Sequence, residues 1–455
     1  MSEGVDTVSM DTPPRLAVDR LLDDRETRII VCCGAGGVGK TTTAAALGVR
    51  AAGRGRKAVV LTIDPARRLA QSMGIDSLDN TPRKVGTVGA GGGELHAMML
   101  DMKRTFDEIV EAHADAERAR AILANPFYQS LSAGFAGTQE YMAMEKLGQL
   151  RARDDWDLII VDTPPSRSAL DFLDAPKRLG SFLDGKFIRV LMAPAKVGGR
   201  AGMKFLNVGM SMMTGTLSKL MGASLLKDVQ TFVAAMDTMF GGFRTRADAT
   251  FRLLQAPGTA FLVVAAPEAD ALREAAYFVE RLAAEKMPLA GLVLNRVHGS
   301  GADQLSAERA LAAAENLEEG GIVDQESGKA GLRDSGAEAT EPTGTAETAG
   351  SADTARTAHS ARTTRTTRTA NPPETGSPGT EGDTAVVDRI TAGLLRLHAE
   401  RMQVIAREQR TRDRFTSLHP EVAVAEVAAL PGDVHDLAGL RAIGERLAAG
   451  VPAGA

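Results

Sequence analysis

The sequence predicts an α/β protein with a mostly parallel, doubly wound sheet, and two observations point to that class. Seven short segments of the 455-residue chain are apolar throughout, as strands covered on both faces are. Longer segments with helical spacing separate them, which is the pattern of repeated strand–helix–strand units. The expected strands are, in chain order, Arg28–Cys33, Lys57–Ile63, His96–Leu100, Asp157–Asp162, Ala260–Ala266, Leu289–Arg296 and Val424–Leu430.

A glycine-rich segment follows the first expected strand. Residues 34–41 read GAGGVGKT, which matches the pattern G-x-x-x-x-G-K-[ST], and a helical run follows. Glycines let backbone N–H groups point at phosphate oxygens, and this context disfavours an ordinary turn. We expect Lys40 to reach the β- and γ-phosphates and the Thr41 hydroxyl to ligate Mg²⁺. The expected nucleotide-binding residues here are Gly34, Ala35, Gly36, Gly37, Val38, Gly39, Lys40, Thr41 and Thr42.

Aspartates stand at the ends of two further expected strands, where parallel sheets bind ligands. Asp64 is expected to orient or deprotonate the water that attacks the γ-phosphate, although an Asp-Pro turn explains this residue alone equally well. Asp162 ends an apolar strand in the Walker-B manner and is expected near Mg²⁺, directly or through water. The sequence therefore predicts a P-loop NTPase that uses ATP and Mg²⁺, with Lys40 and Asp64 as catalytic residues.

Composition and charge exclude several classes of protein. The 53 Lys and Arg residues against 58 Asp and Glu give a net charge of −5, so no nucleic-acid partner is expected. No run reaches the roughly 18 apolar residues of a transmembrane segment. The two cysteines, Cys32 and Cys33, are adjacent and cannot form a disulfide framework, which favours a cytoplasmic location.

Two stretches break the strand–helix alternation. The first is rich in Met, Leu, Gly and Lys, and the second has Leu332 as its only large apolar residue between Val323 and Val386. A stretch so poor in apolar side chains cannot bury enough surface to fold. The expected organisation is a mobile leader (1–24), an ATPase domain (25–316, with a helical subdomain at about 171–250), a disordered low-complexity insertion (317–385) and the C-terminal part of the same domain (386–450).

Several segments together resemble the ArsA-like ATPases, a deviant Walker-A class of P-loop protein. They are 34–42, 62–66, 162–170, 294–296 and 430–440. The family includes arsenite-pump ATPases and ATPases that deliver tail-anchored membrane proteins. The resemblance implies that Asp64 and Asp162 are the switch I and switch II aspartates. It also implies that Asn295 hydrogen-bonds adenine and that the loop at Pro431 packs against the base; without it, Asn295 reads as a turn residue.

The chain departs from this family at its phosphate loop. Members usually carry a lysine where Ala35 stands, and that lysine reaches the opposite nucleotide of a dimer. Either a lysine-bearing paralogue supplies it in a hetero-oligomer, which we favour, or Arg67 or Arg68 substitutes, or hydrolysis is slow. The metalloid-binding cysteines and the zinc-bridging C-x-x-C of other members are also absent, and Cys32 and Cys33 are expected in the core.

The methionines cluster in the expected helical subdomain. Eight of the 18 fall between Met192 and Met239, and part of the run has the spacing of one helix face. Such a stripe is either core or a flexible groove for a hydrophobic client or membrane-protein partner. Both interpretations stay open.

The sequence therefore predicts an Mg-dependent ATPase that couples nucleotide-driven dimer closure to a helical client-binding or partner-binding subdomain. The alternative is a low-turnover nucleotide-binding regulatory subunit of a hetero-oligomer with a lysine-bearing paralogue. A MinD/ParA-type positioning ATPase is less favoured, because residues 441–455 lack a basic or amphipathic membrane-binding tail.

Overall fold

The computed structural model describes most of the chain and divides it into two compact units. One unit is Met1–Gln304 with Arg401–Ala455, and the other is Leu305–Glu400. The described residues are 14–64, 68–86, 91–132, 138–164, 242, 245–319 and 380–449. The expected Met-rich subdomain and most of the expected insertion therefore lie outside the described residues.

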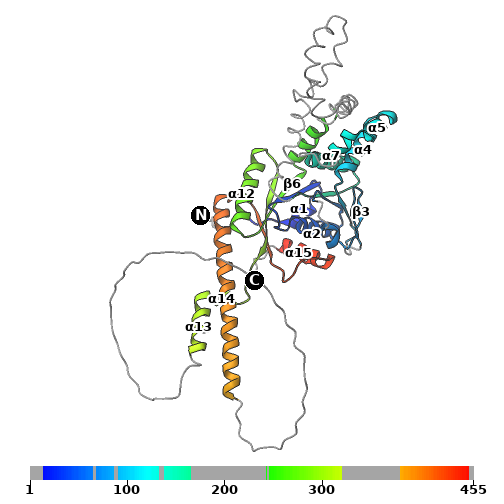
Figure 1. Ribbon diagram of the computed structural model, residues 1–455. Helices are drawn as coiled ribbons and strands as arrows, with labels where there is room; N and C mark the ends of the chain where they lie inside the picture. The colour runs from blue at the N-terminus through cyan, green and yellow to red at the C-terminus, as the bar shows by residue number, and fades with distance from the viewer. Residues whose placement is uncertain are drawn as a thin grey trace, which may run out of the picture. The chain divides into compact units, whose positions relative to one another are not determined.

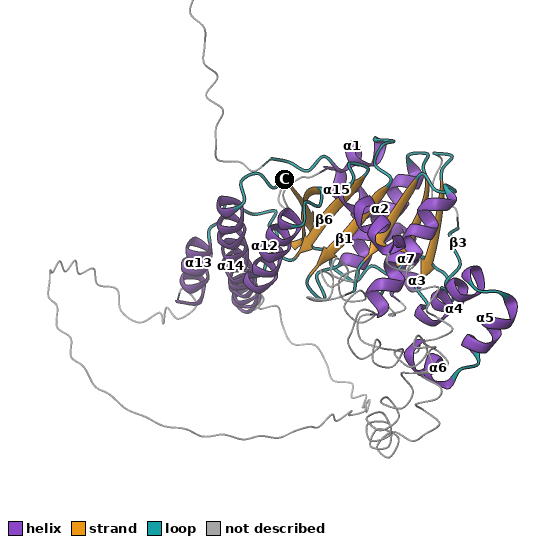
Figure 2. Cartoon of the chain, turned by 90° about the horizontal axis from the view of Figure 1, so that it is seen from above, coloured by secondary structure: helices purple, strands orange, loops and turns teal. Residues whose placement is uncertain are grey.

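The first unit is built on one eight-stranded sheet with the strand order β3-β4-β2-β5-β1-β6-β7-β8 (Figures 1 and 2). Every neighbouring pair is parallel except β3 with β4. The strands are β1 (Ile29–Gly34), β2 (Lys57–Thr62), β3 (Arg83–Lys84), β4 (Glu94–Met99), β5 (Leu158–Asp162), β6 (Thr259–Ala265), β7 (Leu289–Val297) and β8 (Val424–Ala428). The predicted α/β class and its seven strands are confirmed. The strand β3 was not predicted, because two residues are too few to show an apolar pattern.

Helices cover both faces of the sheet, so each strand contributes to two cores. In β1, Ile29 and Val31 enter one core while Ile30 and Cys32 enter the other. The core that contains Ile30 and Cys32 receives α1 (Val18–Asp23), α2 (Lys40–Gly53), α3 (Arg68–Ser72) and α15 (Leu437–Ala449). The other receives α4 (Met102–His113), α5 (Ala116–Leu123), α7 (Thr138–Arg153) and α12 (Ala269–Ala284), with α6 (Pro126–Ser132) beside them.

This packing bears on two expectations from the sequence, the core position of the cysteines and the mobile leader. Burial raises the pKa of Cys33 to about 12, so its thiol stays protonated as a core residue. Within the expected mobile leader 1–24, the chain already belongs to the fold: the N–H of Leu16 donates to Val424 O at 3.0 Å. Asp19 of α1 also accepts two hydrogen bonds, at 2.5 and 2.7 Å, from the guanidinium of Arg50.

The second unit contains α13 (Ala307–Glu319) and the first half of α14 (Thr380–Leu418). The predicted return of helical spacing at Val386 is seen, and the helix begins earlier, at Thr380, within the stretch expected to be disordered. Small side chains on both helices, Ala310 and Ala392 among them, are fully buried. No helix of the described ranges is both long and apolar enough to cross a bilayer.

Arg56 is the largest fully buried side chain in the described structure. Its guanidinium donates to the carbonyl oxygens of Leu22, Asp24, Thr27 and Asp157 at 2.5–3.1 Å, joining the N-terminal segment to the start of β5. Removing the Arg56 guanidinium would leave buried carbonyl oxygens without hydrogen-bond donors.

We expect Arg56→Leu to lower the free energy of unfolding by about 2–4 kcal/mol, because four carbonyl oxygens lose a charged donor. Urea denaturation at neutral pH measures the change. The control is Arg273→Leu, whose side chain is 76% exposed and should change stability little. Equal stability of the two variants would contradict the structural role of Arg56.

Candidate nucleotide-binding site

The phosphate-loop motif connects β1 to α2 at the carboxyl edge of the sheet. Its first and last glycines have left-handed backbone conformations, with φ of 145° at Gly34 and 96° at Gly39. A Cβ at Gly34 would lie 2.0 Å from Val264 O, and one at Gly39 would lie 2.3 Å from Asn295 Nδ2. These two positions therefore require glycine for both conformation and space.

Lys40 begins α2 and folds back over the loop. Its side chain is buried, and Nζ donates to Ala35 O at 2.7 Å. Burial lowers the pKa of the ammonium group, and the negative charge of Asp162 partly opposes that effect. The loop thus holds a cation that is poorly solvated, which is favourable for binding an anion.

Asp162 ends β5 and lies at the centre of the site, fully buried. Its Oδ2 accepts hydrogen bonds from Thr41 Oγ1 at 2.7 Å and from Thr62 Oγ1 at 2.8 Å. Its Oδ1 is buried and has no hydrogen-bond partner among the described residues. Desolvation raises its pKa to about 6, against the opposing hydrogen bonds of the two threonines.

A magnesium ion fits this donor set. Mg²⁺ prefers oxygen ligands, and it is usually held by one or two carboxylates together with substrate phosphates. Asp162 Oδ1 is an orphaned buried acceptor, and the Thr41 hydroxyl donates to the other oxygen, Oδ2, of the same carboxylate. In the part of the chain that the structure describes, no group of three or more His, Cys, Asp or Glu residues forms an all-protein metal cage.

Asp64 follows β2, which lies next to β5 in the sheet. It is half-buried, and its N–H donates to Thr62 Oγ1 at 3.2 Å. Its charge raises the pKa of both Lys40 and Asp162, so its carboxylate acts on the same site. Asp64 is therefore linked to Asp162 through the Thr62 hydroxyl.

Two residues of this site were missed in the sequence. Thr62 bridges Asp64 and Asp162, and Gln139 of α7 donates from Nε2 to Ile63 O at 2.9 Å, fixing the end of β2. Thr62 could have been predicted from the sequence, because it lies just before Asp64 at the end of a strand. Gln139 gave no signal, since it comes from a distant helix.

Asn295 of β7 contacts the loop from the other side. It is buried, and its Nδ2 donates to Val38 O at 2.8 Å. The next residue, Arg296, has φ of 62°, and the β7–β8 register shifts between Asn295 and Val297. This β-bulge sets the direction of the Asn295 amide. Pro431, three residues beyond β8, is exposed in the loop at the same sheet edge.

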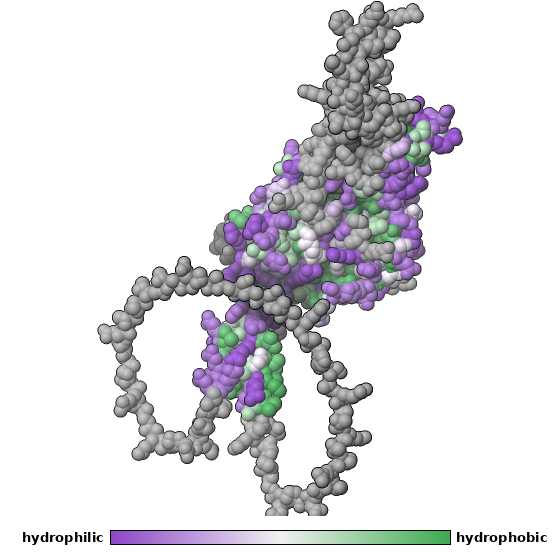
Figure 3. Space-filling view, in the orientation of Figure 1, coloured by the Kyte–Doolittle hydropathy of each residue, from purple (hydrophilic) through white to green (hydrophobic). Residues whose placement is uncertain are grey.

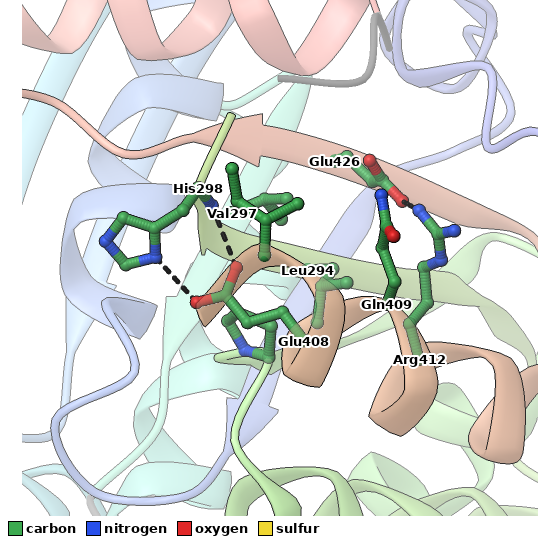
Figure 4. Close-up of a pocket in the computed structure, with 9 residues that line it drawn as sticks. Leu294, Val297, His298, Glu408, Gln409, Arg412 and Glu426 are labelled. Carbon is green, nitrogen blue, oxygen red and sulfur yellow. Dashed lines mark hydrogen bonds and ion pairs between the residues drawn. The ribbon is translucent and has the colours of Figure 1, made fainter. Parts of the chain in front are cut away.

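The opposite side of this bulge is tied to α14 (Figure 4). The N–H of His298 donates to Glu408 Oε2 at 2.9 Å, and its Nδ1 lies 2.6 Å from Glu408 Oε1. Arg412 of the same helix pairs with Glu426 of β8 at 2.8 Å. The His298–Glu408 hydrogen bonds and the Arg412–Glu426 ion pair line a small pocket, and they anchor the helix to the ends of β7 and β8.

A parallel sheet with a phosphate loop after its central strand, and an acidic residue ending the neighbouring strand, defines a P-loop nucleotide-binding protein. Comparison with known families agrees: residues 27–319 match the family model of anion-transporting ATPases. The chain belongs to this ArsA-type family, whose class of enzyme is an ATPase. The predicted family and enzyme class are thereby confirmed.

Known relatives are similar at modest identity. The chain is 31% identical to the ATPase GET3 of Malassezia globosa over 173 residues, which is 38% of this chain and 49% of that protein. It is 26% identical to the ATPase GET3 of Podospora anserina over 298 residues, 64% of this chain and 80% of that protein. A putative arsenical pump-driving ATPase of Halobacterium salinarum is 29% identical over 205 residues, 42% of this chain and 31% of that protein. The chain thus spans about half or less of two of these relatives.

The buried carboxylate of Asp162 should destabilise the nucleotide-free protein. Its folded-state pKa of about 6 lies above the ordinary aspartate value of 3.8. The cost is therefore absent below the unfolded pKa, grows as the pH rises, and is complete above the folded pKa. At pH 7.5 we expect Asp162→Asn to raise the free energy of unfolding by up to about 3 kcal/mol.

Urea denaturation at pH 7.5 and pH 4 measures this effect, and most of the gain should be lost at the lower pH, which is close to the ordinary pKa of 3.8. Asp154→Asn is the control, because Asp154 is exposed and hydrogen bonds from Arg28 and Arg151 lower its pKa. That variant should not gain stability. A less stable Asp162→Asn protein at pH 7.5 would contradict the assignment of a desolvated carboxylate.

Proposed function

We propose that the chain binds Mg-ATP at residues 34–41 and hydrolyses it. The observation that carries this proposal is the buried Asp162 carboxylate, which is bonded to Thr41 at the loop and has an unpaired oxygen. A magnesium ion held by Thr41 and Asp162 would neutralise charge on the phosphates. The glycine-rich backbone and the ammonium group of Lys40 supply the remaining positive field.

The residues of the chain have separate parts in this activity. On nucleotide binding, Lys40 exchanges its hydrogen bond with Ala35 O for one with phosphate oxygens. Asp64 orients the attacking water and accepts its proton, since its carboxylate lies close enough to shift the pKa of Lys40 and Asp162. Asn295 holds the loop through Val38 O and faces the base side of the site, with Pro431 on the neighbouring loop. Catalysis is then chiefly positioning and charge stabilisation.

We further propose that the active form is a dimer that closes around the nucleotides. Ala35, in place of the usual lysine, favours a hetero-oligomer with a lysine-bearing paralogue. The names of the similar proteins support coupling to a client or a transported anion: they include the ATPase GET3 and a putative arsenical pump-driving ATPase. A hydrophobic client or membrane-protein partner at the Met-rich residues 171–250 is the form of coupling we propose.

A second candidate function also rests on Ala35. A chain with alanine at position 35 serves as a low-turnover, nucleotide-binding regulatory subunit if no partner supplies the missing cation. Both candidates require ATP binding, and they differ in the rate of hydrolysis.

Nucleotide binding should depend on Lys40. We expect Lys40→Ala to weaken Mg-ATP binding by about 100-fold or more, because the loop loses its charged phosphate donor. Isothermal titration calorimetry measures the dissociation constant. Lys57→Ala is the matched control: Lys57 begins β2 and lies 5.1 Å from the ring of Trp156, away from the loop. Unchanged ATP affinity in Lys40→Ala would overturn the proposed site.

Hydrolysis should respond to a lysine at position 35. In the purified single chain we expect Ala35→Lys to raise ATP turnover on the order of 10³-fold, because a cation then reaches the opposite nucleotide. Ala35→Met adds a side chain without charge and should not raise turnover. If the unaltered chain already turns over as fast as Ala35→Lys, the missing lysine is not the limiting feature and no paralogue is needed.

A further inference from the structure

Buried polar side chains meet at the end of β2, in contrast to the apolar side chains that α14 exposes at the surface (Figure 3). Thr62 is 1% exposed, and its Oγ1 lies 2.8 Å from Asp162 Oδ2 and 3.2 Å from the backbone nitrogen of Asp64. A hydroxyl has one hydrogen to donate. The Asp162 carboxylate accepts it, because the alternative acceptor, Asp64 O, is uncharged and lies 3.4 Å away. The Asp64 N–H therefore donates to Thr62, and Thr62 donates to Asp162.

A second side chain holds the same stretch of backbone from another element. Gln139 of α7 donates from Nε2 to Ile63 O at 2.9 Å. Ile63 O and the Asp64 N–H are the two polar groups of one peptide unit, and that unit is planar. Thr62 binds the N–H and Gln139 binds the carbonyl oxygen. Together they fix the orientation of the peptide plane from which the Asp64 side chain projects.

Asp162 is held in place without the Thr62 hydroxyl, whereas Asp64 is not held in the same way. The backbone of Asp162 pairs with Cys32 on one side and with Thr62 on the other, and its carboxylate also accepts a hydrogen bond from Thr41. Asp64 lies two residues beyond the end of β2, where side-chain contacts take over from strand pairing. Loss of the Thr62 hydroxyl would therefore displace Asp64 rather than Asp162.

The direction of the Asp64 carboxylate matters for the role proposed for it. A general base acts only within hydrogen-bond reach of the water that it activates. A misplacement of about 1 Å in a catalytic group can lower the rate on the order of 100-fold. Because Thr62 and Gln139 bind this peptide and act through Asp64, their loss should affect hydrolysis and leave nucleotide binding unchanged.

We propose that Thr62 and Gln139 are positioning residues for hydrolysis, which hold the Ile63–Asp64 peptide so that the Asp64 carboxylate faces the attacking water. The inference rests on the proposed ATPase function, and it adds two residues that act through Asp64. The two contacts come from different elements, the end of β2 and the start of α7, so each can be removed without the other.

Single-turnover hydrolysis, with the full-length chain in excess over radiolabelled ATP, tests the proposal and also detects a slow reaction. Thr62→Val keeps the shape of the side chain and removes the hydroxyl, and we expect it to slow hydrolysis about tenfold or more. Isothermal titration calorimetry should give an Mg-ATP dissociation constant within about threefold of the unaltered chain, because the phosphate loop is intact. Thr62→Ser keeps the hydroxyl and should restore the rate to within about threefold.

Thr259→Val is the matched control for the loss of a buried hydroxyl. Thr259 is 2% exposed at the start of β6, and its Oγ1 donates to Leu253 O at 2.8 Å. This variant should leave the rate of hydrolysis unchanged, since it loses a buried hydrogen bond at a distance from Asp64.

The second contact is tested in the same assay. Gln139→Leu should slow hydrolysis as Thr62→Val does, and Gln149→Leu, which changes a half-buried glutamine of the same helix, should not. In an Asp64→Asn background, Thr62→Val and Gln139→Leu should each slow the residual reaction by less than about twofold, because both act through the carboxylate that is already lost.

Hydrogen–deuterium exchange of the nucleotide-free protein gives a readout that does not depend on activity. The Asp64 amide should exchange faster in Thr62→Val than in the unaltered chain, and at the unaltered rate in Thr62→Ser. Circular dichroism checks that each variant is folded.

Unchanged hydrolysis in both Thr62→Val and Gln139→Leu, or an equal loss of rate in the Asp64→Asn background, would overturn the positioning role and leave the ATPase function standing. A chain that binds no Mg-ATP, or that hydrolyses none in a single turnover, would instead contradict the proposed function itself, and this inference with it.

Discussion

The burial of one carboxylate is the constraint on which the nucleotide site depends. Asp162 stands at the end of a central strand, shielded from bulk solvent, and among the described residues its side chain accepts hydrogen bonds from Thr41 and Thr62. The arrangement is unfavourable for the protein alone, since desolvation raises the pKa of this carboxyl to about 6. It becomes favourable when a cation is present. Asp162 thus lowers the stability of the nucleotide-free protein at the position where cation binding needs a desolvated carboxylate.

The site is assembled from elements that are adjacent in the sheet and distant in the sequence. β1 leads into the loop, β5 beside it carries Asp162, and β2 on the far side of β5 carries Thr62. On the other side, β7 directs Asn295 at Val38 O from a bulge whose far side is anchored to Glu408 of α14.

Much of this architecture was predictable from the sequence, because buried parallel strands are continuously apolar and the phosphate loop has fixed chemistry. The strand ends at Gly34 and Asp162 follow from these patterns. What could not be predicted depends on tertiary contacts: the pair of residues in β3, the reach of Gln139 to Ile63 O, and the four carbonyls around Arg56. The direction of the Asn295 amide was also hidden, since it depends on a left-handed residue at Arg296.

The central claim is that the backbone amides of the loop, Lys40 and Asp162 together hold a magnesium-complexed triphosphate. Hydrogen–deuterium exchange with and without Mg-ATP tests it most directly. The account predicts slower exchange at the amides of residues 35–42 and at the ends of β2 and β5, with the protection lost when magnesium is chelated. Unchanged exchange in the loop under saturating Mg-ATP, or protection confined to another part of the chain, would contradict it.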